Sequence, residues 1–562
     1  MWTKSDKEFN MDLEKSLPNQ PQETELSKAD MYDITPRFAE QAGTKRNIKS
    51  RHAQMIAIGS AIGTGFFLST GQALAIGGPA FLLIAYCLMS ILVYGVTTAM
   101  MEMSTYLPVS GASMSYFGGR FVSPSLGFAM GWLYFYSFAI IVAFELTAAS
   151  VLINYWPNNV DTAVWITVLI VVVVGLNFFP VGVFAEVEFW FAGIKVVVIV
   201  GLLVLSLVLM LGGGPTHDRL GFRYWKEPGA VNTYILDGDS GRFTAFLYVW
   251  VFSGFSFYFG PELMVFTSGE MRNPRKNLAS ASRRYFYRLV VFYVLGSLAI
   301  GVTCRSDAKD LTSGSSNASA SPFVIAIRNA GIPALPSIIN AALVSSAWSA
   351  GNSYLFMSSR ALYSLALAGN APRIFAKCNR YGLPVYAVIA SSCFAPLAYL
   401  DCSAQAGVAL NWFVSLTNTS GYVSWTMCCI VYFRFRKAAK LQCVTAPYSS
   451  YFQPWAARVS FVAFICLLLC NGFTMFYPGQ FTASGFLTTY LGIPIFLVIY
   501  FGHKLTVGRH DSWMRSPEDV DLTSGVHEVN MDAEMWTQLE QVEKEKKYVQ
   551  NKVWRALSSM WQ

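Results

Sequence analysis

Charged residues are scarce in this chain. They make up 13% of its 562 residues, whereas an average soluble protein carries about 25%, and hydrophobic residues reach 54%. The few charges gather in the first 52 residues, in the last 60 and in several short connections. This composition excludes an ordinary soluble domain and indicates a chain that lies within a lipid bilayer.

Motifs of soluble enzymes and nucleotide-binding proteins are also missing. The chain has no glycine–lysine loop for phosphate, so we do not expect ATP to act on it. Its five histidines lack metal-ligand spacing, and its ten cysteines form no CxxC cluster. No motif for nucleic acid is present. We therefore expect no enzyme activity, no catalytic residues, no metal, no cofactor and no nucleic-acid partner.

What the chain has instead is a series of long apolar runs. About 20 helical residues cross the hydrocarbon layer of a bilayer, which is about 30 Å thick. We predict an all-α integral membrane protein, with a tail over 1–52, a twelve-helix domain over 53–503 and a second tail over 504–562. The predicted spans are residues 53–75, 79–103, 124–153, 162–181, 187–211, 243–268, 285–304, 334–367, 384–401, 406–433, 457–477 and 483–503.

Basic residues predict the orientation of these spans. Clusters of Lys and Arg precede span one and follow spans six, eight and ten, so the positive-inside rule places both tails in the cytosol of a multi-pass plasma-membrane protein. Asn317, in an Asn-Ala-Ser sequon, is then a glycosylation candidate on the outside. Lysines of the first tail are candidate ubiquitin acceptors, which would make ubiquitin-ligase adaptors partners.

The C-terminal tail predicts a further helix. Residues 534–561 space their apolar side chains as an amphipathic helix does. Docking to a membrane surface or partner and packing as a solvated helix both remain open.

Span one weakens its own helix. The stretch IGSAIGTGFFLSTG, residues 58–71, places four glycines and a threonine at mid-membrane, and each glycine costs a helix about 1 kcal/mol relative to alanine. Gly59 and Gly63 fit a GxxxG packing face, whereas Gly63 and Gly65 cannot share one face. Close packing and local unwinding are therefore both open at this point.

Span six favours unwinding. It contains VFSGFSFYFGPELMVF, residues 251–266, in which Gly254, Gly260 and Pro261 interrupt the helix. Spans one and six begin two sets of five, and paired interruptions of this kind indicate an inverted-repeat transporter. Such breaks provide free N–H groups at one half-helix end and free C=O groups at the other, which match the carboxylate and ammonium of an amino acid.

Several separate motifs resemble one known family. RHAQMIAIGSAIGTGFFLSTG, ELTAAS (145–150), EVEFWFAGIK (186–195) and GNAPRIFAKCNRYGLP (369–384) are similar to motifs of the fungal amino-acid permeases, the yeast amino-acid transporter family within the amino acid–polyamine–cation superfamily. The resemblance covers roughly residues 45–525. It implies a LeuT-like fold, with ten helices in a 5+5 inverted repeat, helices one and six unwound, and two additional C-terminal helices.

The resemblance also implies a substrate site. The carboxylate would meet the amides and hydroxyl of the span-one break, and the ammonium would meet carbonyls of both breaks. Span six departs from the family's usual FSFGGTEL-like stretch, since it reads FSFYFGPEL. The substrate-binding candidates are Ala61, Ile62, Gly63, Thr64, Gly65, Phe255, Ser256, Phe257, Tyr258 and Phe259.

Three ionisable residues within spans are candidates for proton coupling. Lys195 lies about eight residues, or about 12 Å, into span five, where a charge is costly and suggests a function. The resemblance places this lysine where sodium-driven relatives bind sodium. Glu145 in span three and Glu262 in span six are its candidate partners. A purely structural ion pair or hydrogen bond is the alternative for each.

The sequence therefore predicts a secondary active transporter that imports amino acids by proton symport and alternating access. Its partners are an amino acid, protons and the lipid bilayer. Two alternatives remain open: an amino-acid sensor that resembles a transporter, and a permease for a polyamine or related amine. The side-chain specificity is not readable from the sequence, although neutral or broad specificity is preferred.

Overall fold

The computed structural model describes residues 48–49, 51–52, 55, 63–109, 113–157, 159–312, 321–403 and 406–559. Several predicted features lie outside the described residues: most of the N-terminal tail with its lysines, the first part of span one with Ala61 and Ile62, and the sequon at Asn317.

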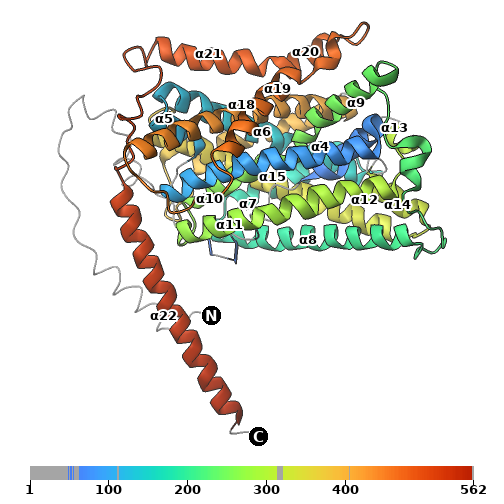
Figure 1. The fold of residues 1–562 in the computed structure, drawn as a ribbon. Helices are drawn as coiled ribbons and strands as arrows, with labels where there is room; N and C mark the ends of the chain where they lie inside the picture. The colour runs from blue at the N-terminus through green and yellow to red at the C-terminus, as the bar shows by residue number, and fades with distance from the viewer. Residues whose placement is uncertain are drawn as a thin grey trace.

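The described chain is helical, and its membrane domain is a bundle of roughly parallel helices (Figure 1). Within the described ranges the only strand-like pairing is one bridge between Ile48 and Met271. The long elements are α4 (Thr64–Tyr106), α6 (Pro124–Ile153), α7 (Thr162–Asn177), α8 (Val181–Leu211), α9 (Gly238–Ser253), α10 (Gly260–Ser268), α11 (Pro274–Arg288), α12 (Gly296–Thr303), α15 (Leu335–Leu367), α16 (Val385–Ser392), α18 (Ala406–Leu441), α19 (Trp455–Cys470), α20 (Ala483–Tyr490), α21 (Gly492–Leu505) and α22 (Val526–Ser559).

Helices lie in each of the twelve predicted spans, as far as the chain is described. Span three, predicted at 124–153, coincides with α6. Six of the helical segments are long and apolar enough to cross a membrane individually, and the pair α20 and α21, bent by 42°, makes a seventh. An all-helical, multi-pass membrane protein is therefore confirmed, although the count of twelve spans is not established by this measure.

Spans one and two form one kinked helix. α4 has 43 residues, which is about 65 Å of helix and twice the thickness of a hydrocarbon layer. Gly78 interrupts it with φ 76° and ψ 175°, and Pro79 follows. The amide of Ala80 is freed by this kink and donates to the carbonyl of Ala230 at 2.9 Å. The kink is the turn between the two spans, and the segment before α9 satisfies its backbone.

Span six is broken as the sequence predicts. α9 ends at Ser253, a 3-10 turn η3 covers Gly254–Phe257, and α10 begins at Gly260. Between them Tyr258 is extended, with ψ 140°, and Phe259 is left-handed, with φ 59°. Because a left-handed phenylalanine is rare, the surrounding side chains have to hold this break in place.

One end of the bundle is closed by the C-terminal segment. We call residues 515–540 the strap and the end that they cover the tail face; α22 leaves the bundle there (Figure 1). Arg120 of α5 (Met114–Phe121) donates to the carbonyls of Asp521 and Ser524 at 2.8 and 2.7 Å, and Tyr106 donates to Leu522 O at 2.5 Å. Burial raises the pKa of Asp521, but Arg120 and nearby N–H groups lower it by more.

The tail face also carries a buried ion pair. Arg360 Nε of α15 lies 2.6 Å from Glu270 Oε1, which directly follows α10, and both side chains are at most 5% exposed. The backbone of Glu270 accepts from the Ile48 amide at 3.0 Å. Glu270, which follows the second half of span six, is thus bound to Arg360 of α15 and to the backbone of Ile48.

Gly127 tests the tight crossing of α5 and α6. A Cβ at this position would lie 2.7 Å from Gly119 Cα and 2.8 Å from Ser115 O, which are backbone atoms that cannot rotate away. We expect Gly127→Ala to destabilise the protein by about 1–3 kcal/mol, because the helices have to separate. The measurement is thermal unfolding in detergent, followed by fluorescence.

Gly201→Ala in α8 is the matched control, since nothing lies within 4 Å of its Cβ position. It should be neutral or stabilising, because alanine favours a helix. Equal melting temperatures for the two variants would contradict the close crossing.

Candidate functional site

The described part of span one begins at Gly63, and its helix starts against a carboxylate. Gly63 is extended, with φ −101° and ψ −151°, and α4 starts at Thr64. The amide N and the hydroxyl Oγ1 of Thr64 donate to Glu145 Oε2 at 3.2 and 3.0 Å. A Cβ on Gly63 would collide with the Glu145 carboxylate, so only glycine allows this approach. The free N–H groups at the start of a helix favour a negative group there.

The span-six break is held by hydroxyl groups from neighbouring helices. Tyr354 of α15 donates to the carbonyl of Tyr258 at 3.4 Å, and Tyr422 of α18 donates to the carbonyl of Val251 at 2.6 Å. These bonds satisfy carbonyls in and near the break that hydrocarbon could not satisfy. The break therefore depends on two tyrosines that come from the helices around it.

Ser256, within η3, lies in a cluster of hydroxyl groups. Its Oγ is 2.8 Å from Tyr86 Oη and 3.2 Å from Ser69 Oγ, which both come from α4. The two broken spans are therefore linked by side chains as well as by packing. This link connects the wall of the candidate site to both halves of α4.

A small cavity lies between the two breaks. Its lining residues come from α4 and the residue before it, α6, η3 and the residue after it, α15 and α18: Gly63, Gly65, Phe66, Ile141, Glu145, Phe255, Ser256, Tyr258, Tyr354 and Thr417. A water-sized sphere can move its centre through only about 10 Å³ of this cavity, which is space for about one water molecule. The structure is thus closed around the site, and an amino acid needs side-chain movement to enter.

Six of the predicted site residues line this cavity: Gly63, Gly65, Glu145, Phe255, Ser256 and Tyr258. Thr64 adjoins it through its bonds to Glu145. Two predicted residues face elsewhere. Phe257 stacks on Tyr293 with ring centroids 4.0 Å apart, and Phe259 packs edge-on against Phe138 at 4.8 Å. The 3-10 turn and the left-handed residue rotate successive side chains away from helical positions, which separates these rings from the cavity.

Four lining residues are absent from the sequence prediction: Phe66, Ile141, Tyr354 and Thr417. Tyr354 and Thr417 are polar residues within long spans, so the rule that intramembrane polar groups are functional could have found them. Phe66 and Ile141 are apolar residues in apolar helices, and no sequence signal distinguishes them.

The other coupling candidates lie away from the cavity lining. Glu262 Oε1 accepts from Ser424 Oγ at 3.3 Å, and its Oε2 has no hydrogen-bond partner within the described chain. Lys195 is 3% exposed, and its Nζ likewise has no hydrogen-bond partner among the described residues. Glu188 and Glu145 are the carboxylates that act on it electrostatically. Both candidates are thus buried ionisable groups in their predicted helices.

The arrangement offers polar partners for both ends of a zwitterion, once side-chain movement makes room for it. The Thr64 amide and hydroxyl form an anion site, and in this structure the carboxylate of Glu145 occupies it. The carbonyl O of Phe255 lies 3.7 Å from the Cβ position of Gly65, on the same cavity, and could accept from an ammonium group. No lining residue other than Glu145 is ionisable, apart from the two tyrosines.

The fold is similar to that of a solved transporter. The manganese transporter of Eremococcus coleocola matches with a TM-score of 0.50 and 12% identity, over 92% of this chain and 98% of that one. At this identity the likeness concerns the fold alone, and it supports the LeuT-like architecture that the family resemblance implies.

Sequence comparisons are more specific. A proline-specific permease of Emericella nidulans is 44% identical, over 87% of this chain and 90% of its own length. A probable proline-specific permease of Schizosaccharomyces pombe is 47% identical, over 84% of this chain and 87% of its own. The family model named amino acid permease matches residues 52–516, and the chain belongs to that family.

Proposed function

We propose that the chain imports a small, net-neutral amino acid, with proline as the first candidate, together with a proton across the plasma membrane by alternating access. The observation that carries this proposal is the contact of the Thr64 amide and hydroxyl with a carboxylate at the span-one break. Two relatives named for proline support the choice of substrate. The basic residues of the tail face support a cytosolic location for that face and for both tails.

A neutral substrate follows from the charges of the cavity. Glu145 is its one carboxylate, and no cation lines it. An amino acid with an acidic side chain would bring a second anion without a partner. An amino acid with a basic side chain would need a charged Glu145 as the partner of that side chain. Its own carboxylate would then lie beside the charged Glu145 at Thr64, and the two anions would repel each other. A zwitterion with an apolar side chain needs only one anion site and one carbonyl site.

Substrate binding and proton uptake are coupled through exchange at Thr64. The carboxylate of the substrate needs the same two donors that Glu145 now uses. Two carboxylates cannot both remain charged side by side in a buried site, so Glu145 takes up a proton as it leaves. One proton then enters with each amino acid. The movement of one positive charge down 100 mV releases about 2.3 kcal/mol, which is roughly a fiftyfold concentration ratio.

Lys195 is the second part of this proposed circuit. Its ammonium and the guanidinium of Arg288 face the carboxylates of Glu188 and Glu145, so two cations balance two anions while Glu145 is ionised. Once Glu145 is protonated, these groups carry one excess positive charge, which favours release of a proton by Lys195 or the approach of an anion. The lysine thereby connects the protonation of the cavity with the packing of α8 against α15 and α12.

The proposed function is tested by uptake of labelled amino acids into permease-deficient yeast cells that express the chain. We expect proline to accumulate, and we expect a protonophore or a rise in external pH to reduce accumulation. One pH unit changes the driving force by about 1.36 kcal/mol, or tenfold, for one coupled proton. A panel of the twenty amino acids, choline and a polyamine defines the substrate class.

Accumulation that changes neither with the protonophore nor with external pH would contradict proton symport. Binding without uptake would instead indicate a sensor. Uptake of choline or a polyamine, with no amino acid competing, would contradict the carboxylate site.

Thr64→Val tests the anion site. Valine keeps the shape of threonine but loses the hydroxyl donor, and a hydrogen bond to a charged group contributes about 1.5–3 kcal/mol. We expect the KM for uptake to rise at least tenfold and Thr64→Ser to restore it. The control is Thr70→Val on the same helix, because the hydroxyl of Thr70 donates only to the Phe66 carbonyl, at 2.7 Å. An unchanged KM in Thr64→Val would exclude the hydroxyl from substrate binding.

Glu145→Gln tests the exchange of carboxylates. Glutamine is the same size and its amide oxygen still accepts from Thr64, but it cannot take up the proton. We expect exchange of labelled for unlabelled substrate to continue, while accumulation against a gradient and its pH dependence are lost. If Glu145→Gln keeps full pH-dependent accumulation and Lys195→Met loses it, then Lys195 and not Glu145 carries the coupled proton.

A further inference from the structure

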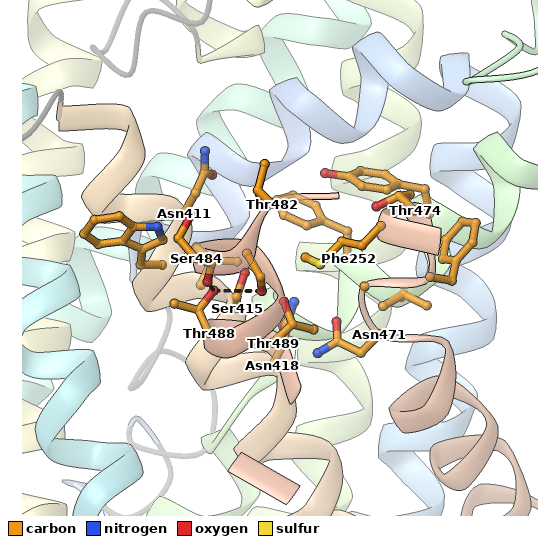
Figure 2. Close-up of a pocket in the computed structure, with 18 of the residues that line it drawn as sticks. Phe252, Asn411, Ser415, Asn418, Asn471, Thr474, Thr482, Ser484, Thr488 and Thr489 are labelled. Atoms are coloured by element: carbon orange, nitrogen blue, oxygen red, sulfur yellow. Dashed lines mark hydrogen bonds between the residues drawn. The ribbon is translucent and has the colours of Figure 1, made fainter. Parts of the chain in front are cut away.

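A second, larger cavity lies at the end of the bundle opposite the tail face. Its volume is about 350 Å³, within the range of small-molecule sites. Figure 2 shows side chains from α18, α20 and the connection between α19 and α20 facing one another around it. Gln72 of α4 and Phe252 of α9 complete the wall. Under the proposed orientation this cavity opens toward the outside, and we call it the vestibule.

The vestibule is polar but carries no charge. None of its lining residues is Asp, Glu, Lys, Arg or His. Side-chain amides and hydroxyls, such as those of Asn411, Ser415 and Asn418, provide donors and acceptors. The rings of Phe252 and Trp412 provide apolar surface beside them. This combination suits a small zwitterion with an apolar side chain, and gives no preference for a net charge.

One polar atom of this wall lacks a partner. Asn418 is 4% exposed, and its Oδ1 accepts no hydrogen bond within the described chain. A buried acceptor of this kind is costly unless a ligand or water satisfies it. The ammonium group of an amino acid is a suitable donor. Asn471, drawn near Asn418 in Figure 2, is held by a 2.9 Å bond from its Nδ2 to Thr419 Oγ1.

The vestibule lies directly beside the central cavity. Phe252 lines the vestibule and Phe255 lines the central cavity, and these residues are three apart at the start of the span-six break. In α18, Asn418 lines the vestibule and its neighbour Thr417 lines the central cavity. The Phe255 ring packs edge-on against Phe144 of α6, with centroids 4.9 Å apart. Residues 252–255, where α9 ends and the break begins, therefore lie between the two cavities, and we call them the span-six floor.

We propose that the vestibule is a second amino-acid site, at which a net-neutral amino acid binds between Asn418, Asn471 and Trp412 before the span-six floor moves and admits it to the central cavity. The proposal rests on the proposed function, because it takes the same substrate class. It differs from the central site in its residues, since neither Thr64 nor Glu145 lines the vestibule.

The test measures ligand binding at the vestibule separately from transport. Ser415→Cys places a thiol in its wall, and an impermeant thiol reagent labels it from outside; labelling of the parent chain is subtracted for the native cysteines. We expect proline or another net-neutral amino acid to protect Ser415→Cys from labelling. Addition of Thr64→Val should leave the half-protecting concentration within twofold, while the KM for uptake rises at least tenfold.

Two substitutions at Asn418 complete the test. Asn418→Leu should raise the half-protecting concentration at least tenfold. Asn418→Asp adds a carboxylate, so lysine or arginine should then protect Ser415→Cys from labelling better than proline does. A misfolded variant cannot show this new protection. A half-protecting concentration that shifts in parallel with the KM, or no protection by any net-neutral amino acid, overturns the vestibule site. Protection without any uptake would contradict the proposed transport and leave the vestibule site standing.

Discussion

The contact that the rest of the structure depends on is the one between Thr64 and Glu145 (3.0 and 3.2 Å). A bilayer does not tolerate free backbone groups, so a helix that begins in mid-membrane requires an acceptor from another helix. α6 supplies a carboxylate to the start of α4. In the same way, Tyr354 of α15 and Tyr422 of α18 supply donors to carbonyls at the span-six break. The three helices that surround the breaks are therefore the ones that line the cavity.

The two ends of the bundle differ in how firmly they are closed. At the tail face, the strap and the Arg360–Glu270 pair connect α5, α10 and α15. At the opposite end, a cavity of about 350 Å³ is lined by α18, α20 and the connection between α19 and α20. A transporter that alternates between two openings has to close the end that holds the cavity and open the tail face. The ionic and backbone contacts of the tail face are the ones that would have to break in that exchange.

Sequence reasoning predicted the fold well and the site in part, for a physical reason. Hydrophobic length and charge fix where a span lies, so 124–153 coincides with α6. Gly254 and Pro261 mark a break, because they cannot support a regular helix. Neither pattern fixes which way a side chain turns within the break. Phe257 and Phe259 were therefore expected at the site and face Tyr293 and Phe138 instead, whereas Ile141 lines the cavity without any local signal.

The same segment of span six explains why a substrate would bind first at the vestibule and only then at the central cavity. Phe255 and Ser256 line a cavity with space for about one water, so no amino acid fits while this segment is in its present position. Phe255 packs against Phe144 at the central cavity, and Phe252, three residues earlier, lines the vestibule, so a movement of this segment would change both cavities. A substrate already held at Asn418 would enter as the floor moves, before water could replace it. Its carboxylate would then reach Thr64 in a site without bulk solvent, where the proposed exchange with Glu145 would require a proton, because two adjacent buried carboxylates cannot both stay charged.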